Sequence, residues 1–170
     1  MISNFKNIIR FFILALVSGC ICVERNNAGL SSVKVLPLTQ MAIQRELNAV
    51  IPSISKRSLF FLATKTNDKG MMVGFDKDDR SILIGIDKEK KIISIDIDLE
   101  ASKGTFTPIE SKGVEVPASC EKLNLGCYRT VLRFSFANMK DASNVILDVF
   151  LKFYDVPADK EMEFFETLRL

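Results

Sequence analysis

IISIDIDL, residues 92–99, alternates apolar and polar side chains without a break. In an extended chain its isoleucines and leucine, at positions 93, 95, 97 and 99, point to one side. Ser94, Asp96 and Asp98 point to the other side. Such a strict period of two is typical of a strand in an antiparallel sheet with one buried face and one face in water.

Similar apolar segments flank this strand, and turn-forming residues separate them at residues 67–70, 76–80, 88–91 and 139–143. Further strands are predicted at residues 59–66, 71–75, 81–87, 128–139 and 144–156. At least six strands, with turns about every 8–12 residues, favour an all-β sandwich or barrel.

Two helices are predicted at the ends of this domain. The first covers residues 39–50, whose apolar side chains recur at helical spacing: Ile43, Leu47 and Val50. The second is short, begins after Pro157 and has apolar residues at every third position: Met162, Phe165 and Leu168. The predicted fold is mainly β, an antiparallel β-sandwich with one N-terminal helix and a short C-terminal helix.

The N-terminal residues have the pattern of an export signal. Lys6 and Arg10 precede the apolar run FFILALV, residues 11–17, and the small residues Ser18 and Gly19 follow it. The run is shorter than the roughly 20 apolar residues that span a bilayer. We therefore predict a signal peptide at 1–22, a flexible lead-in at 23–32, one domain at 33–170, and secretion of the mature protein.

Composition limits the functions open to this domain. The whole chain has 23 basic and 21 acidic residues, and loss of Lys6 and Arg10 with the leader leaves 21 of each. Nucleic acid binding is not predicted, because it needs a basic surplus on the folded domain. Histidine is absent, which excludes Ser–His or Cys–His catalysis and zinc held by His. We predict no catalytic residue, metal or cofactor.

The cysteines suggest two kinds of modification. In an oxidising compartment, Cys120 and Cys127 are predicted to form a disulfide that closes a small loop. Cys20 follows Val17-Ser18-Gly19 and fits the pattern of a bacterial lipobox, in which the cysteine is lipidated after cleavage. The alternative to plain secretion is therefore a lipoprotein held at a membrane through Cys20, with a structural or adhesive role.

Seven cations are candidates for binding an anionic partner: Lys56, Arg57, Lys88, Lys90, Lys91, Arg129 and Arg133. The first five lie at a strand start and in one turn. Arg129 and Arg133 lie on the same side of one strand, opposite its apolar face. If these groups converge, they can hold sulfate or carboxylate through forked arginine contacts. The alternative is that they are ordinary solubilising charges.

Two sets of aspartates are candidates for a calcium site or for a pair of catalytic carboxylates. Asp76, Asp78 and Asp79 lack the glycine and the distal glutamate of a calcium loop. Asp96 and Asp98 have a spacing that fits the two carboxylates of a glycoside hydrolase, but residues i and i+2 of any strand have it. Asp96 and Asp98 are therefore expected to line the wet face of their strand.

The order of elements resembles the thrombospondin N-terminal-like module, a relative of laminin-G domains. A helix (MAIQRELNAVI) leads through SISKRS into LFFLATKT, KGMMVGFD, SILIGID and KIISIDIDL. LGCYRTVLRFSF and ASNVILDVFLKFYD follow at the places of later strands. The resemblance implies a jelly-roll sandwich that binds sulfated glycans or extracellular matrix proteins and has no catalytic activity. We therefore expect a secreted binding module that acts through its surface loops.

Overall fold

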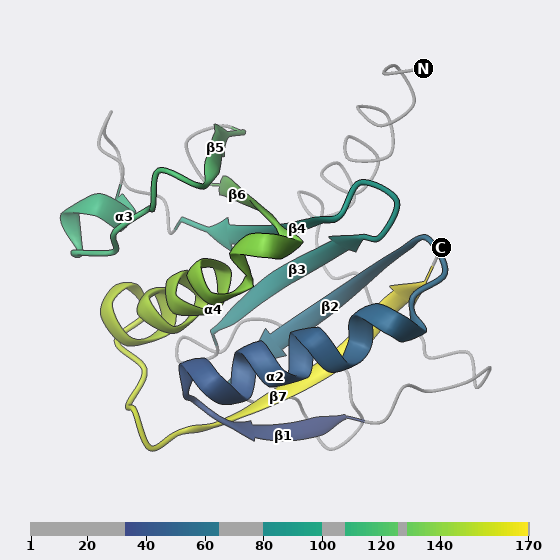
Figure 1. The fold of residues 1–170 in the computed structure, drawn as a ribbon. Helices are drawn as coiled ribbons and strands as arrows, with labels where there is room; N and C mark the ends of the chain where they lie inside the picture. The colour runs from purple at the N-terminus through teal and green to yellow at the C-terminus, as the bar shows by residue number, and fades with distance from the viewer. Residues whose placement is uncertain (1–32, 65–79, 100–107, 126–128, 170) are drawn as a thin grey trace, which may run out of the picture. The chain divides into compact units, whose positions relative to one another are not determined.

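The computed structural model describes residues 33–64, 80–99, 108–125 and 129–169. Within these residues seven antiparallel strands form one sheet, in the order β1-β7-β2-β3-β4-β6-β5 (Figure 1). The strands are β1 Lys34–Pro37, β2 Arg57–Ala63, β3 Ser81–Asp87, β4 Ile92–Asp98, β5 Glu121–Asn124, β6 Arg129–Ser135 and β7 Glu161–Arg169. The mainly β character predicted from the sequence is confirmed.

One face of the sheet lies beneath two helices, α2 (Gln40–Val50) and α4 (Met139–Asp148) (Figure 1). The central strands β3 and β4 send six isoleucines to this covered face, each at most 2% exposed: Ile82, Ile84, Ile86, Ile93, Ile95 and Ile97. The alternate residues point to the opposite side, which we call the outer face. The period of two predicted for residues 92–99 is confirmed.

Helix α2 coincides with the helix predicted over residues 39–50. Thr39 caps its start, because the Thr39 hydroxyl accepts a hydrogen bond from the Ala42 N–H at 3.2 Å. Ile43 and Leu47 are buried on the side that faces the sheet. Two of the apolar residues whose spacing predicted the helix are therefore the ones through which it packs on the sheet.

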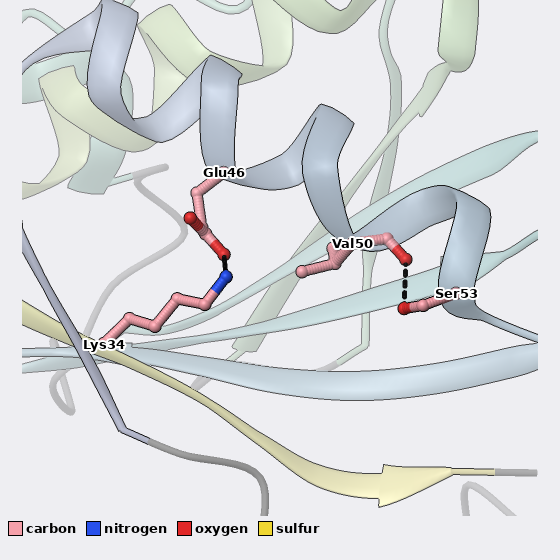
Figure 2. A network of polar contacts seen from close by, with 4 residues as sticks. All are labelled: Lys34, Glu46, Val50 and Ser53. Atoms are coloured by element: carbon pink, nitrogen blue, oxygen red, sulfur yellow. Dashed lines mark hydrogen bonds and ion pairs between the residues drawn. The ribbon is translucent and has the colours of Figure 1, made fainter.

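Polar contacts hold α2 at two points (Figure 2). Lys34 of strand β1 forms an ion pair with Glu46, within the helix. At its C-terminal end, the hydroxyl of Ser53, in the short 3₁₀ helix η1 (Ile51–Ser53), donates to the carbonyl of Val50, the last residue of α2, at 2.8 Å. An ion pair thus links the helix to the edge strand β1, and a hydrogen bond orders the segment that leads from the helix to β2.

The strand predicted at residues 144–156 is wrong, because this segment is helical. Helix α4 is followed directly by a π-helical turn, η3 (Val149–Phe153). Four buried side chains recur at helical spacing and face the sheet and α2: Val145, Ile146, Val149 and Phe150. The preceding strand, β6, is shorter than predicted and ends at Ser135, where the 3₁₀ turn η2 (Phe136–Asn138) leads into α4.

The predicted C-terminal helix is also wrong. Strand β7 occupies this segment and lies between β1 and β2. Its pairing with β2 aligns two phenylalanine pairs: the rings of Phe164 and Phe60 are stacked at 5.1 Å, and those of Phe165 and Phe61 lie 5.7 Å apart. These contacts between strands stabilise the extended conformation. They outweigh the helix that the apolar residues at every third position predicted.

The second sheet of the expected sandwich is not found among the described residues. There, helices α2 and α4 cover the buried face, and the short helix α3 (Pro108–Ser111) contacts η3. No helix in this part of the chain has the length and hydropathy needed to cross a bilayer. The predicted signal peptide, lead-in and strand at 71–75 lie outside the described residues, so those predictions stand untested.

Candidate functional site

Five of the seven candidate cations meet at one end of the sheet. The first residue of β2 pairs with the last residue of β3, Arg57 with Asp87. The Lys88 N–H donates to the Lys56 carbonyl at 2.8 Å, which joins the segment before β2 to the turn between β3 and β4. We call this cluster the basic end: Lys56, Arg57, Lys88, Lys90 and Lys91.

Two of these cations have structural roles. The Arg57 Nε atom lies 2.9 Å from an Asp87 carboxylate oxygen. The Lys88 ammonium group donates to the carbonyls of Ile54 at 2.8 Å and Pro52 at 3.1 Å. These carbonyls lie at the end of η1, where the helix itself provides no hydrogen-bond donor. The Lys88 ammonium group therefore satisfies two acceptors that would otherwise lack an intrahelical partner.

The other three lysines, Lys56, Lys90 and Lys91, have exposed side chains. The turn that carries two of them is well ordered, since the Lys90 N–H donates to the Asp87 carboxylate at 2.9 Å. Lys91 adopts the left-handed backbone conformation, with φ at 55°. Polar and ionic contacts thus hold the backbone of the basic end, and the side chains of Lys56, Lys90 and Lys91 are exposed at its surface.

Arg129 and Arg133 are separate from the basic end. Both extend from β6 onto the outer face, as predicted, and each lies beside an acid from a neighbouring strand. The Arg129 Nε atom is 3.1 Å from a carboxylate oxygen of Asp96, and an Arg133 terminal nitrogen is 3.6 Å from one of Glu121. The structure therefore divides the predicted cation set into two groups with different surroundings.

Among the described acids of the outer face, Asp96 is the one with a buried carboxylate oxygen that lacks a hydrogen-bond partner. It lies in a row across the sheet between Leu83 of β3 and Val131 of β6. The paired atoms, Asp96 Oδ1 and Arg129 Nε, are buried, and neither has a hydrogen-bond partner of good geometry among the described residues. Burial raises the pKa of Asp96, and the opposing effect of Arg129 is smaller. For the Asp96 carboxylate, the cost of burial therefore exceeds the attraction to Arg129.

Tyr154 belongs to the same end of β4 and was not predicted as a site residue. Its hydroxyl donates to the Asp98 carbonyl at 3.2 Å, and the Arg80 guanidinium carbon lies 5.8 Å from its ring centroid. Burial is the main cause that raises the pKa of the Tyr154 hydroxyl, and the Asp98 charge adds to it. The sequence analysis missed Tyr154 because it predicted a strand over residues 144–156. In the structure, Tyr154 directly follows the helical turn η3.

The remaining predicted residues are tested only in part. Cys120 is half-buried and has no disulfide partner among the described residues. Its predicted partner, Cys127, and the proposed lipidation site, Cys20, lie outside them. Burial raises the pKa of the Cys120 thiol. Within the described ranges no three His, Cys, Asp or Glu side chains gather in a metal-binding arrangement.

Comparisons of the chain with family models, curated proteins and solved structures gave no match.

Proposed function

We propose that the protein is a secreted, non-enzymatic binding module whose basic end recognises a sulfated glycan. The observation that carries the proposal is the exposure of Lys56, Lys90 and Lys91 on two turns joined by a backbone hydrogen bond. Lysines placed together on an ordered backbone attract closely spaced sulfates, and the backbone that carries them needs no further ordering on binding. An extracellular matrix protein is the other partner that the sequence leaves open.

The charge distribution supports a local site. Once the leader is removed, acidic and basic residues of the mature domain are equal in number, so attraction of a polyanion has to come from one patch. At the basic end Arg57 is neutralised by Asp87 and Lys88 caps η1. These two residues hold the turns in place, and the three exposed lysines provide the binding charge.

The likeness to laminin-G modules enters this proposal through function only. Helices α2 and α4 lie where the second sheet of a jelly-roll sandwich would pack. Recognition through loops at a sheet end does not depend on that second layer. The position of the proposed site therefore rests on the basic end alone.

Heparin-affinity chromatography with a salt gradient tests the proposal. The mature wild-type protein should elute well above about 0.15 M salt, the physiological value. The triple variant Lys56→Gln, Lys90→Gln, Lys91→Gln should elute much earlier. A control that removes three exposed cations elsewhere, Arg45→Gln, Lys140→Gln, Lys160→Gln, has the same net charge and should elute near the wild type.

Two results would overturn the proposal. The first is elution of the wild type at or below physiological salt. The second is an equal shift for the two triple variants, because that would assign binding to net charge and not to the basic end. Circular dichroism of each variant checks that its fold is intact.

A further inference from the structure

The outer face carries a second line of cations that continues from the basic end. On this face Arg133 lies opposite Ser94 of β4, and Arg129 lies opposite Asp98 at the far end of that strand. Strand β4 starts directly after Lys91. From Lys91 to the position opposite Arg129 the line follows seven residues, roughly 23 Å at about 3.3 Å per residue. Only an extended ligand reaches from one end of this line to the other.

The two arginines are neutralised to different degrees. Glu121, the partner of Arg133, is 62% exposed and 3.6 Å away, which is typical of a loose surface pair. Asp96, the partner of Arg129, is 21% exposed and 3.1 Å away, and the atoms in contact are buried. Arg129 nevertheless keeps a quarter of its side chain exposed. The state of Asp96 therefore changes by one unit the net charge that Arg129 and its neighbouring carboxylates present.

Few charged groups of the described chain face Asp96. Arg129 approaches from β6, and Asp98 lies two residues after Asp96 on β4. The hydroxyl of Tyr154, the residue after η3, is close enough for the Asp96 charge to affect it. The Arg80 guanidinium, just before β3, also acts on Tyr154, and its central carbon lies 5.8 Å from the ring centroid. Leu83 and Val131, directly across in β3 and β6, are uncharged. Only Arg129 favours the ionised carboxylate of Asp96, whereas burial and Asp98 oppose it.

We propose that Asp96 is a proton-controlled brake on the binding of a linear sulfated chain along β4 and β6. When the Asp96 carboxylate takes a proton from solvent, its ion pair with Arg129 is lost. Arg129 and Arg133 then extend the basic end into one strip. This inference rests on the function proposed above and adds to it the shape of the ligand and its control by acidity.

The direction of the pKa change supports such a brake. Because burial raises the pKa of Asp96, proton uptake occurs at milder acidity than for an exposed aspartate. Release of the partly exposed Arg129 guanidinium should strengthen binding of a polysulfate about two- to fivefold, roughly the factor for a single surface ion pair. The effect adds to the binding by the three lysines and does not replace it.

The experiment measures heparin binding to the mature protein at pH 7.5 and pH 5, with four variants. Asp96→Asn should bind about two- to fivefold more tightly than the wild type at pH 7.5, and this advantage should shrink at pH 5. The control Asp159→Asn changes net charge equally but lies before β7, where Lys160 bonds to the segment after β1. Its advantage should be smaller and the same at both pH values.

Arg129 is tested directly by two further variants. Arg129→Gln should bind like the wild type at pH 7.5 and lose part of the tightening seen on acidification. The double variant Asp96→Asn, Arg129→Gln should lose the advantage of the single aspartate change. Arg129→Gln also keeps the test decisive if Asp96→Asn fails to fold.

The outcomes separate this inference from the proposed function. Equal affinity of Asp96→Asn and the wild type at pH 7.5, or full acid tightening in Arg129→Gln, overturns the brake. If the lysine triple variant still weakens binding in that case, the basic end stands. A wild type that does not bind heparin at physiological salt at either pH overturns both.

Discussion

The two faces of the sheet are built from alternate residues of the same strands, but their chemistry differs. On the covered face of β4, Ile93, Ile95 and Ile97 are completely buried beneath the helical layer. On the outer face the intervening residues include Ser94 and Asp96, and arginines of β6 pair with acids beside them. A single period of two therefore separates an apolar core that sets stability from a charged face that is available for recognition.

The largest effect should come from the covered face. Replacing Ile95 by Ala removes a completely buried side chain and should lower the free energy of unfolding by about 2–5 kcal/mol. Leu83, half-buried on the outer face, is the matched site, and Leu83→Ala should cost clearly less. Urea denaturation of both variants makes the comparison. Equal losses would show that the outer face is packed as tightly as the covered face.

A smaller effect should separate Lys88 from Lys56 within the basic end. Lys88→Met removes the ammonium group that bonds to the Ile54 and Pro52 carbonyls, and should cost about 1–2 kcal/mol of stability. Lys56→Met changes an exposed side chain and should stay within about 0.5 kcal/mol of the wild type. In heparin binding we expect the opposite order of effects. A variant pair that loses stability and affinity in parallel would refute this division of roles.

The smallest effect concerns the pH dependence of stability on the outer face. Because the pKa of Asp96 is raised, the folded protein holds this proton more tightly than the unfolded chain. Its contribution to stability is therefore complete below the unfolded pKa and is lost as the pH rises through the folded pKa. Relative to the wild type, Asp96→Asn should gain stability as the pH rises from about 4, the unfolded pKa of an aspartate, through the folded pKa.

Urea titrations at several pH values within this window measure that difference. Asp159→Asn, which alters an exposed carboxyl group away from Arg129, serves as the control. A stability difference for Asp96→Asn that decreases with rising pH would mean that attraction to Arg129 dominates over burial.

Period-two segments made the centre of the sheet predictable, but two later elements depend on context. Residues 144–156 are apolar at so many positions that they fit a strand as well as a helix, and packing against α2 selects the helix. The β7 segment contains Glu, Met and Leu, which favour helices. Its strand conformation comes from Phe164 and Phe165 meeting partners on β2, about 100 residues earlier in the sequence.

The sequence predicted which residues belong to the candidate site, but it did not predict which of them form ion pairs. The sequence identifies cations on turns and on one strand, and it also places Arg129 and Arg133 on the same face. It does not provide the strand register that brings Arg129 to Asp96 and Arg57 to Asp87. Nor does it indicate that Lys88 bonds to η1, because that contact joins residues more than 30 positions apart.

Chemical-shift mapping of the amide resonances during a titration with a heparin oligosaccharide, near physiological salt, tests the central claim most directly. If the basic end is the binding surface, the largest changes fall at residues 56–57 and 88–91, and those of α2 stay small. Changes confined to the helices, or no changes at saturating oligosaccharide, would contradict the account.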